Sequence, residues 1–230
     1  MTLPRRVEAV VFDMDGLLVD TETMFRDVMM EVTRRRGLHL PLQVFLGMVG
    51  VTQETNRLQA LNHFGPDFDY EDWIAEISDL AHARLEVEVV VKAGVVELLD
   101  FLEAAAIPRA VATSSGHPAV VRQLAPGGLL PRFQAIVAAG DYARGKPNPD
   151  PFLTAAARLG VDPAACLALE DSHNGVRAAH AAGMMTIMVP DLLEATPEMR
   201  GLCVAVAETL HAVRDLLVEQ RRSPAPAPGV

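Results

Sequence analysis

A short, mostly apolar run at residues 7–12 leads directly into two aspartates, Asp13 and Asp15. The run is rich in β-branched residues and predicts a short buried strand. A carboxylate at the end of a buried strand is costly without a cation beside it, and two so close together repel one another. The pattern therefore requires a metal ion, a lysine, or both beside these aspartates.

This stretch has two other interpretations. A calcium-binding EF-hand loop needs an oxygen ligand, a glycine and a glutamate at its fifth, sixth and twelfth positions. This chain has Leu17, Leu18 and Met24 there, which excludes the EF-hand. A plain turn that uses Asp and Gly as turn formers remains an alternative when the stretch is taken alone.

The net charge of −10 argues against a nucleic-acid surface or an anionic membrane as partner. No stretch approaches the about 20 apolar residues of a membrane span. The two cysteines, Cys166 and Cys203, suggest no disulfide framework and fit a reducing cytosol. We expect a cytoplasmic monomer with no nucleic-acid or membrane partner.

The hydrophobic periodicity changes along the chain. Helical patterns at residues 21–36, 54–64 and 71–85 occur without any strand pattern between them. From residue 89 strands alternate with helices, which predicts βαβ units and a parallel sheet. The predicted strands are 107–113, 135–139, 166–169 and 184–189, and the predicted helices are 94–105, 117–124, 149–159, 174–182 and 208–219.

We therefore predict an α/β core from residues 1–19 and 90–222, interrupted by an all-helical domain at residues 20–89. The Pro/Ala-rich tail, residues 223–230, is expected to be disordered.

Polar residues follow four of the predicted strands. The carboxyl ends of parallel strands lie along one edge of the sheet, where open α/β folds bind ligands. The convergence of separate segments on this edge is a stronger indication of a site than any single motif. The groups are Asp13 and Asp15 after the first strand, Thr113 and Ser114 after the second, Lys146 after the third, and Glu170 and Asp171 after the fourth.

The four acids of this set, Asp13, Asp15, Glu170 and Asp171, are candidate metal ligands. Their oxygens suit a hard cation. Mg²⁺ fits best, because it is usually held by few carboxylates together with waters and phosphate oxygens.

The remaining groups suit a phosphate. Thr113, Ser114 and the backbone N–H groups that follow can hydrogen-bond an anion, and Lys146 supplies a compact positive charge. Asp13, at the strand end, is the candidate nucleophile, and attack on phosphorus would form an aspartyl-phosphate. Asp15 is the candidate general acid and base.

Each of these motifs also has a purely structural interpretation. Lys146, between Gly145 and Pro147, is by itself more typical of a solvated loop lysine. The hydroxyl residues 113–115 and the segment 170–172 could each serve only as a helix cap. All three interpretations would have to hold together, in chain order, at successive strand ends.

Four motifs follow one another in chain order. They are Asp13-x-Asp15 after a strand, Thr113 at the second strand end, Lys146 in Gly-Lys-Pro-Asn-Pro-Asp, and Glu170-Asp171-Ser172-x-Asn174-Gly175-Val176. With these motifs the chain resembles the haloacid dehalogenase superfamily of phosphohydrolases over nearly its whole length, the tail excepted. This resemblance implies a Rossmann-like core, an aspartyl-phosphate route, Mg²⁺ dependence, and a helical cap domain at residues 20–89 that closes over a small phosphorylated metabolite.

Within that superfamily, the helical insert resembles the subgroup that contains β-phosphoglucomutase and pseudouridine-5′-phosphatase. The mutase grips a second phosphate with an arginine and a lysine, where this chain has Gln53 and Gly116. A cap lysine and a cap histidine of the mutase correspond to Val49 and Phe25. These differences favour hydrolysis over the mutase alternative.

Two further functions are disfavoured. Dehalogenase activity would leave Asp15 and the metal-binding acids without a role. A non-catalytic sensor of phosphorylated ligands has no support, because every catalytic position is filled.

Overall fold

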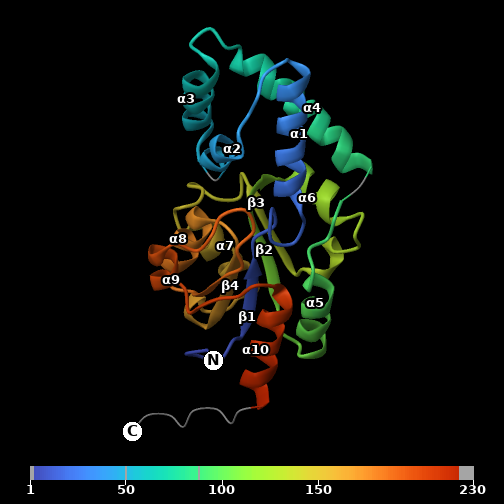
Figure 1. Cartoon of the computed structure of the whole chain (residues 1–230). Helices are drawn as coiled ribbons and strands as arrows, with labels where there is room; N and C mark the ends of the chain where they lie inside the picture. Colours follow the sequence, from blue (N-terminus) through green and yellow to red (C-terminus); the bar gives the residue numbers. More distant parts are fainter. Residues whose placement is uncertain (1–2, 50, 88, 223–230) are drawn as a thin grey trace. The chain divides into compact units, whose positions relative to one another are not determined.

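The computed structural model describes residues 3–49, 51–87 and 89–222, and the predicted disordered tail lies outside these residues. The chain divides into two compact units (Figure 1), one of residues 1–19 and 91–230 and one of residues 20–90. The sequence patterns predict that residue 90 belongs to the core. It clusters instead with the helical unit, where the Val90 carbonyl accepts the Asp20 N–H at 2.8 Å.

The first unit contains a six-stranded sheet in the order β3-β2-β1-β4-β5-β6, with every pair of neighbours parallel. The chain order reverses at β1, which lies between β2 and β4; such switch points bind ligands in open α/β sheets. The strands are β1 (Ala9–Phe12), β2 (Arg109–Gly116), β3 (Ala135–Ala139), β4 (Cys166–Glu170), β5 (Met185–Met188) and β6 (Ala205–Val206).

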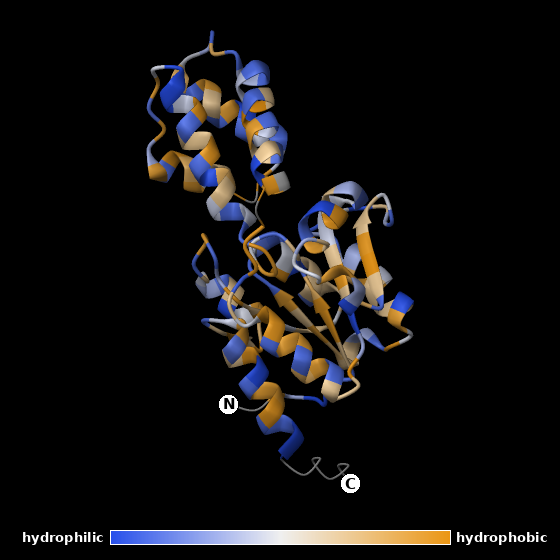
Figure 2. Ribbon diagram, turned by 90° about the vertical axis from the view of Figure 1, so that its right-hand side faces the viewer, coloured by the Kyte–Doolittle hydropathy of each residue, from blue (hydrophilic) through white to orange (hydrophobic). Residues whose placement is uncertain are grey.

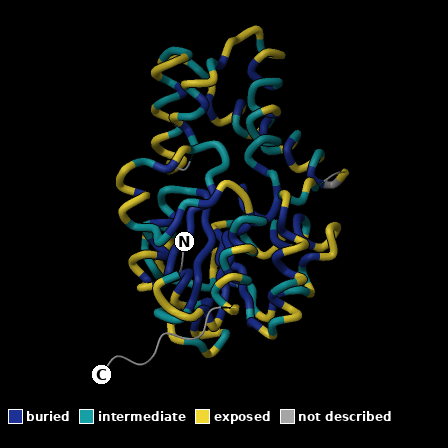
Figure 3. The backbone as a smooth tube through the Cα atoms, turned by 60° about the horizontal axis from the view of Figure 1, so that its bottom comes forward, coloured by how far each residue is buried: buried dark blue, intermediate teal, exposed yellow. Residues whose placement is uncertain are grey.

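The helices of this unit cover the sheet (Figure 3). Strands β1, β4 and β5 are wholly buried, whereas β2, β3 and β6 each contain residues that are partly exposed. Alternate residues of β1, Ala9 and Val11, pack in one apolar cluster with Phe152 of helix α7 (Asp150–Leu159) and Ala178 of helix α8 (His173–Ala181). The helices are α5 (Val95–Ala104), α6 (His117–Leu124), α7 (Asp150–Leu159), α8 (His173–Ala181), α9 (Pro197–Leu202) and α10 (Leu210–Arg222), with 3₁₀ turns at Leu130–Arg132 and Pro163–Ala165.

The regular secondary structure of the second unit is all helical within its described residues, as the sequence patterns predict. Apolar faces of its helices meet in its interior (Figure 2). Trp73 is buried there, packs edge-on against Phe64 and Phe68, and donates its indole N–H to the Thr33 hydroxyl at 3.1 Å. The helices are α1 (Thr21–Arg35), α2 (Leu42–Met48), α3 (Gln53–Phe64) and α4 (Tyr70–Val87).

Three short elements were not predicted from the sequence. Helices α2 and α9 and the two-residue strand β6 are too short to carry a clear hydrophobic period. The predicted longer elements match the structure to within a few residues at their ends. Cys166 and Cys203 are both free thiols. Within the described ranges, no helix combines the length and apolar character needed to cross a membrane.

Candidate active site

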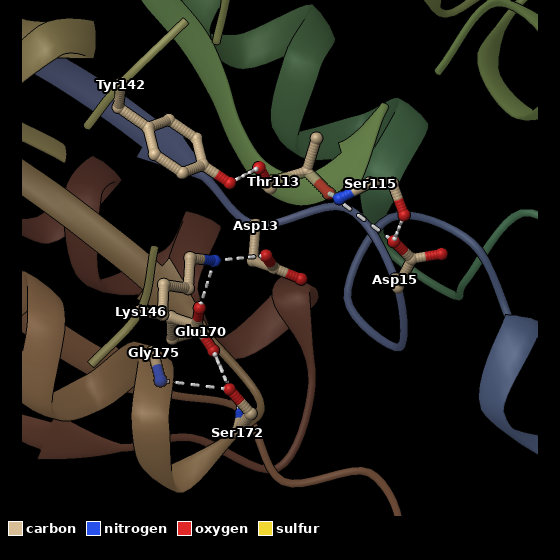
Figure 4. Close-up of polar contacts among 9 residues, drawn as sticks. All are labelled: Asp13, Asp15, Thr113, Ser115, Tyr142, Lys146, Glu170, Ser172 and Gly175. Carbon is tan, nitrogen blue, oxygen red and sulfur yellow. Dashed lines mark hydrogen bonds and ion pairs between the residues drawn. The ribbon is translucent and has the colours of Figure 1, made fainter. Parts of the chain in front are cut away.

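Several of the predicted functional residues lie together at the carboxyl edge of the sheet (Figure 4), namely Asp13, Asp15, Thr113, Lys146 and Glu170. Phe12 of β1 is in register with Val111 of β2 and with Leu169 of β4. The next residue along β1 is Asp13, and the next along β4 is Glu170, so these acids emerge at the same level on neighbouring strands. The switch point at β1 therefore carries both acids.

Lys146 reaches this edge from the loop between β3 and α7. Its ammonium group forms ion pairs with Asp13 and with Glu170, the latter at 2.6 Å, and lies 5.0 Å from the centre of the Phe152 ring. Only 6% of the Lys146 side chain is exposed, so the interpretation of Lys146 as a solvated loop lysine is wrong.

Burial and charge compete at this pair. Burial raises the pKa of Asp13, Lys146 opposes that rise, and Glu170 and Asp15 add to it. Burial alone would lower the pKa of Lys146, but its two carboxylate partners outweigh burial and raise that pKa. Lys146 is therefore a permanent cation at neutral pH, and it does not by itself compensate the acids around it.

Three buried acids, Asp13, Glu170 and Asp171, form a group that fits a metal ion. One oxygen from each lies within 4.8 Å of the others. Three carboxylates facing a single ammonium leave an excess of negative charge, which a divalent cation would balance. An all-oxygen set of few carboxylates is the donor chemistry that Mg²⁺ prefers.

Glu170 also organises the loop that carries Asp171. One of its oxygens binds Lys146, and the other accepts the Ser172 N–H and the Ser172 hydroxyl, both at 2.9 Å. The Ser172 hydroxyl in turn accepts the Gly175 N–H at 3.1 Å and begins helix α8. The cap interpretation of this segment is thus correct for Ser172, while Glu170 and Asp171 belong to the acid group.

Asp15 lies in a different part of the site. Its carboxylate accepts the Ser115 hydroxyl at 2.8 Å and faces the Thr113 hydroxyl at 3.4 Å. These hydroxyls hold the Asp15 side chain at the end of β2. Among the residues that the structure describes, Asp15 is not part of the three-acid group. The role of the Asp15 side chain as a metal ligand stays a prediction, which this geometry does not support.

The predicted phosphate-binding segment forms the end of β2. Thr113 is fully buried, and its hydroxyl accepts the Ser115 N–H at 3.0 Å, whereas Ser114 is exposed. Helix α6 begins directly after this segment, at His117. A strand end that leads directly into a helix start provides N–H groups for an anion.

Several residues of this site were not assigned a role from the sequence. Ser115 holds Asp15, although the hydroxyl run 113–115 was recognised as a motif. Tyr142 donates its hydroxyl to the Thr113 carbonyl at 3.1 Å, and no sequence pattern points to it. A side chain at Gly175 would collide with Glu170, because an added Cβ would lie 1.7 Å from its Oε1 atom.

The site lies at the switch point of a parallel sheet. It combines the candidate nucleophile Asp13, the cation Lys146 and a group of acids, which is a set suited to binding phosphate. Residues 10–189 match the model of the haloacid dehalogenase-like hydrolase family. The match spans most of the chain and includes all the groups described above. The chain belongs to this family and is a hydrolase of that class.

Known relatives include a phosphatase and a mutase. The chain is 34% identical over 198 residues to a Drosophila melanogaster protein named "Probable pseudouridine-5'-phosphatase", with 81% of this chain and 83% of that protein covered. It is 31% identical over 225 residues to β-phosphoglucomutase of Bacillus subtilis, with 93% and 95% covered.

A solved structure shares the fold. The crystal structure of a family hydrolase from Deinococcus radiodurans R1, with bound phosphate and sodium, has a TM-score of 0.81 to this chain. It is 28% identical, and the comparison covers 96% of this chain and 99% of that one.

Proposed function

We propose that this protein is a Mg²⁺-dependent phosphatase that hydrolyses a small phosphomonoester through an aspartyl-phosphate on Asp13. The observation that carries the proposal is the buried Asp13 carboxylate, paired with Lys146 and next to the acid Asp171. A carboxylate is a weak base, but it attacks phosphorus well once the negative charge of the phosphoryl oxygens is neutralised.

The reaction divides into two displacements. An Asp13 oxygen forms a bond to phosphorus while the ester oxygen leaves with a proton from Asp15. Asp15 then accepts a proton from a water molecule, whose oxygen attacks phosphorus and releases Asp13 and inorganic phosphate. The hydrogen bonds from Ser115 and Thr113 keep Asp15 at the end of β2 between these two steps.

Charge neutralisation comes from several directions. Lys146 faces the nucleophile, and the Thr113 hydroxyl and following N–H groups lie on the β2 side. Asp13 and Asp171 would hold Mg²⁺ directly, because both oxygens of Glu170 already accept hydrogen bonds. Bound Mg²⁺ would supply electrostatic stabilisation of the transferring phosphoryl group.

The substrate we propose is a sugar or nucleoside phosphate. The relatives named above act on molecules of these classes according to their names, and one family structure contains bound phosphate. The strong negative charge of the chain disfavours a nucleic-acid substrate. We propose a cytoplasmic monomer as the working form.

The second candidate is a sugar phosphomutase, which the similarity to β-phosphoglucomutase supports. Gln53 and Gly116 stand where that enzyme class has cationic side chains for a second phosphate. Without them a bisphosphate would dissociate before it could return its phosphoryl group, so hydrolysis is favoured.

Release of inorganic phosphate from p-nitrophenyl phosphate in Mg²⁺ tests the proposal. Replacement of Asp13 by Asn should lower kcat on the order of 10⁶-fold, as loss of the nucleophile does in a serine hydrolase. Asp67→Asn, at an exposed position of the second unit, is the matched control and should retain activity. Activity that survives Asp13→Asn would exclude Asp13 as the nucleophile.

The same preparation separates phosphatase from mutase. Incubated with β-glucose 1-phosphate and a trace of the 1,6-bisphosphate, a mutase would form glucose 6-phosphate faster than free phosphate. We expect the opposite order.

A further inference from the structure

Two adjacent residues of the β3–α7 loop hold the two ends of the segment 113–117. Tyr142 donates its hydroxyl to the Thr113 carbonyl at 3.1 Å. Asp141 accepts a hydrogen bond from the His117 imidazole at 3.0 Å. One loop therefore holds both ends of the segment that is proposed to receive phosphate.

The loop itself is well anchored. The Asp141 carboxylate oxygen that faces His117 also accepts the Ala138 N–H and the Arg158 guanidinium, each at 3.0 Å. Arg158 belongs to α7 and Ala138 to β3, so Asp141 ties the loop to the elements on both sides of it. Tyr142, the next residue, is placed by this anchor.

The contact to the Thr113 carbonyl constrains the group on the other side of the same peptide bond. A peptide unit is planar and trans, so the Thr113 carbonyl and the Ser114 N–H lie in one plane and point in opposite directions. A hydrogen bond that holds the carbonyl therefore also fixes the direction of the Ser114 N–H. That N–H is the first backbone donor after Thr113.

We propose that Tyr142 is a positioning residue for phosphate, which fixes the Thr113–Ser114 peptide so that the Ser114 N–H is held ready for the anion. The inference rests on the proposed function. Without the Tyr142 hydroxyl, the peptide would have to be ordered at the moment of binding, and part of the binding free energy would be lost.

The phenol is suited to this role. Tyr142 is half-buried beside the site, and Figure 4 shows its hydroxyl directed at Thr113. Burial raises the pKa of Tyr142, although Lys146 and Ser114 oppose the rise. The hydroxyl thus stays a proton donor at neutral pH, as the bond to a carbonyl oxygen requires.

Tyr142→Phe tests the proposal by removing a single oxygen atom. The only other tyrosine, Tyr70, is buried in helix α4 of the second unit, so Tyr70→Phe is the matched control. Inorganic phosphate is titrated against each protein in Mg²⁺ by calorimetry, and KM and kcat are measured with p-nitrophenyl phosphate.

We expect Tyr142→Phe to weaken phosphate binding and raise KM by about 3- to 10-fold, the range for loss of one net hydrogen bond. The change in kcat should be less than about twofold, since the hydroxyl touches neither Asp13 nor the reacting atoms. Tyr70→Phe should change none of these values. Equal phosphate affinity in the Tyr142→Phe and native proteins would overturn the proposal, as would a fall in kcat alone.

A second measurement does not depend on the folding of Tyr142→Phe. In the Tyr70→Phe protein, Tyr142 is the sole tyrosine, and NMR can follow exchange of its hydroxyl proton with water. We expect exchange slower than that of free tyrosine, and slower again with bound phosphate. Exchange as fast as in free tyrosine in both states would overturn the proposal.

These results are separable from the proposed function. Phosphate binding without turnover would refute the phosphatase assignment and still test Tyr142. Turnover with a Tyr142→Phe affinity equal to the native value would refute only the role of Tyr142.

Discussion

The Lys146 ammonium lies 2.6 Å from the Glu170 carboxylate, and both side chains are almost completely shielded from water. The two residues come from different segments, the β3–α7 loop and the end of β4. An ion pair so buried is weak support for stability by itself, but it becomes costly to break from one side. The same ammonium also contacts Asp13. The stability of the core and the chemistry of the site therefore both depend on Lys146.

Removal of the Lys146 charge should therefore destabilise the protein as well as inactivate it. Lys146→Met leaves Glu170 buried without its cation, and we expect a loss of about 3–5 kcal/mol in the free energy of unfolding. Urea unfolding followed by circular dichroism measures this loss. The double variant Lys146→Met/Glu170→Gln should recover part of the stability but no activity.

The chain offers a matched control in its other lysine, Lys92, which pairs with Asp191 at 2.6 Å and is 27% exposed. Lys92→Met should cost clearly less, because water can solvate part of the pair. Equal losses in the free energy of unfolding for the two lysine variants would show that burial does not make the Lys146 ion pair costlier to break.

Gly175 should not tolerate even an alanine. A Cβ there would lie 1.7 Å from Glu170 Oε1 and 1.8 Å from its Cδ, so Glu170 would have to leave its place between Lys146 and Ser172. We expect a loss of about 2 kcal/mol or more in unfolding free energy, within the range for overpacking, together with a fall in activity.

Gly201→Ala in α9 is the control for this substitution, because a Cβ there meets nothing within 4 Å. It should be neutral or stabilise the protein by up to about 1 kcal/mol, since alanine favours the helix. The thermal midpoints of the two variants should therefore move in opposite directions or differ widely. Similar midpoints would show that Glu170 has room to move.

Metal removal should affect both activity and stability. Excess EDTA should abolish phosphate release, and added Mg²⁺ should restore it. Because the ion binds only the folded acid group, Mg²⁺ at about 100 times its Kd should add about 2.7 kcal/mol to the free energy of unfolding. Asp171→Asn removes one charge from the group and should abolish most of this gain. A gain equal to that of the native protein would place the ion elsewhere.

Asp141 should make the stability depend on acid pH. Its hydrogen bonds from Arg158, from the Ala138 N–H and from His117 hold the pKa of its carboxyl well below the usual range. A group whose pKa is lowered on folding stabilises the native state above its unfolded pKa, about 4, and loses this effect as the pH falls towards its native pKa.

The difference in stability between the native protein and Asp141→Asn should thus be largest at neutral pH and shrink below about pH 4. Urea unfolding at pH 7, 5 and 3 measures it. Asp67→Asn should show little difference at any of these pH values, because Asp67 is exposed. A difference between native protein and Asp141→Asn that is constant with pH would show that the lowered pKa of Asp141 does not contribute.

Much of the fold follows from local patterns. The strand before Asp13, the helical character predicted for residues 20–89 and the strand–helix alternation after it could all be predicted, because the hydrophobic period reflects which face of an element is buried. Helix α2 and strand β6 were not, since a few residues carry too little period.

The composition of the candidate site followed from the sequence in the same way. Parallel strands present their carboxyl ends at one edge, so acids, hydroxyls and a lysine at successive strand ends had to meet there. Asp13, Thr113, Lys146 and Asp171 do come together at that edge.

What only the tertiary structure decided is which of these groups touch one another. Asp15 binds Ser115 rather than joining the acid group, Glu170 shares Lys146 with Asp13, and Tyr142 reaches the Thr113 carbonyl. The physical reason is that a hydrogen bond forms only within a range of donor–acceptor distance that is a few tenths of an ångström wide. Packing between segments distant in sequence sets that distance. The sequence by itself determined which chemistry is assembled, through strand order and residue type, and the packed core determined its geometry.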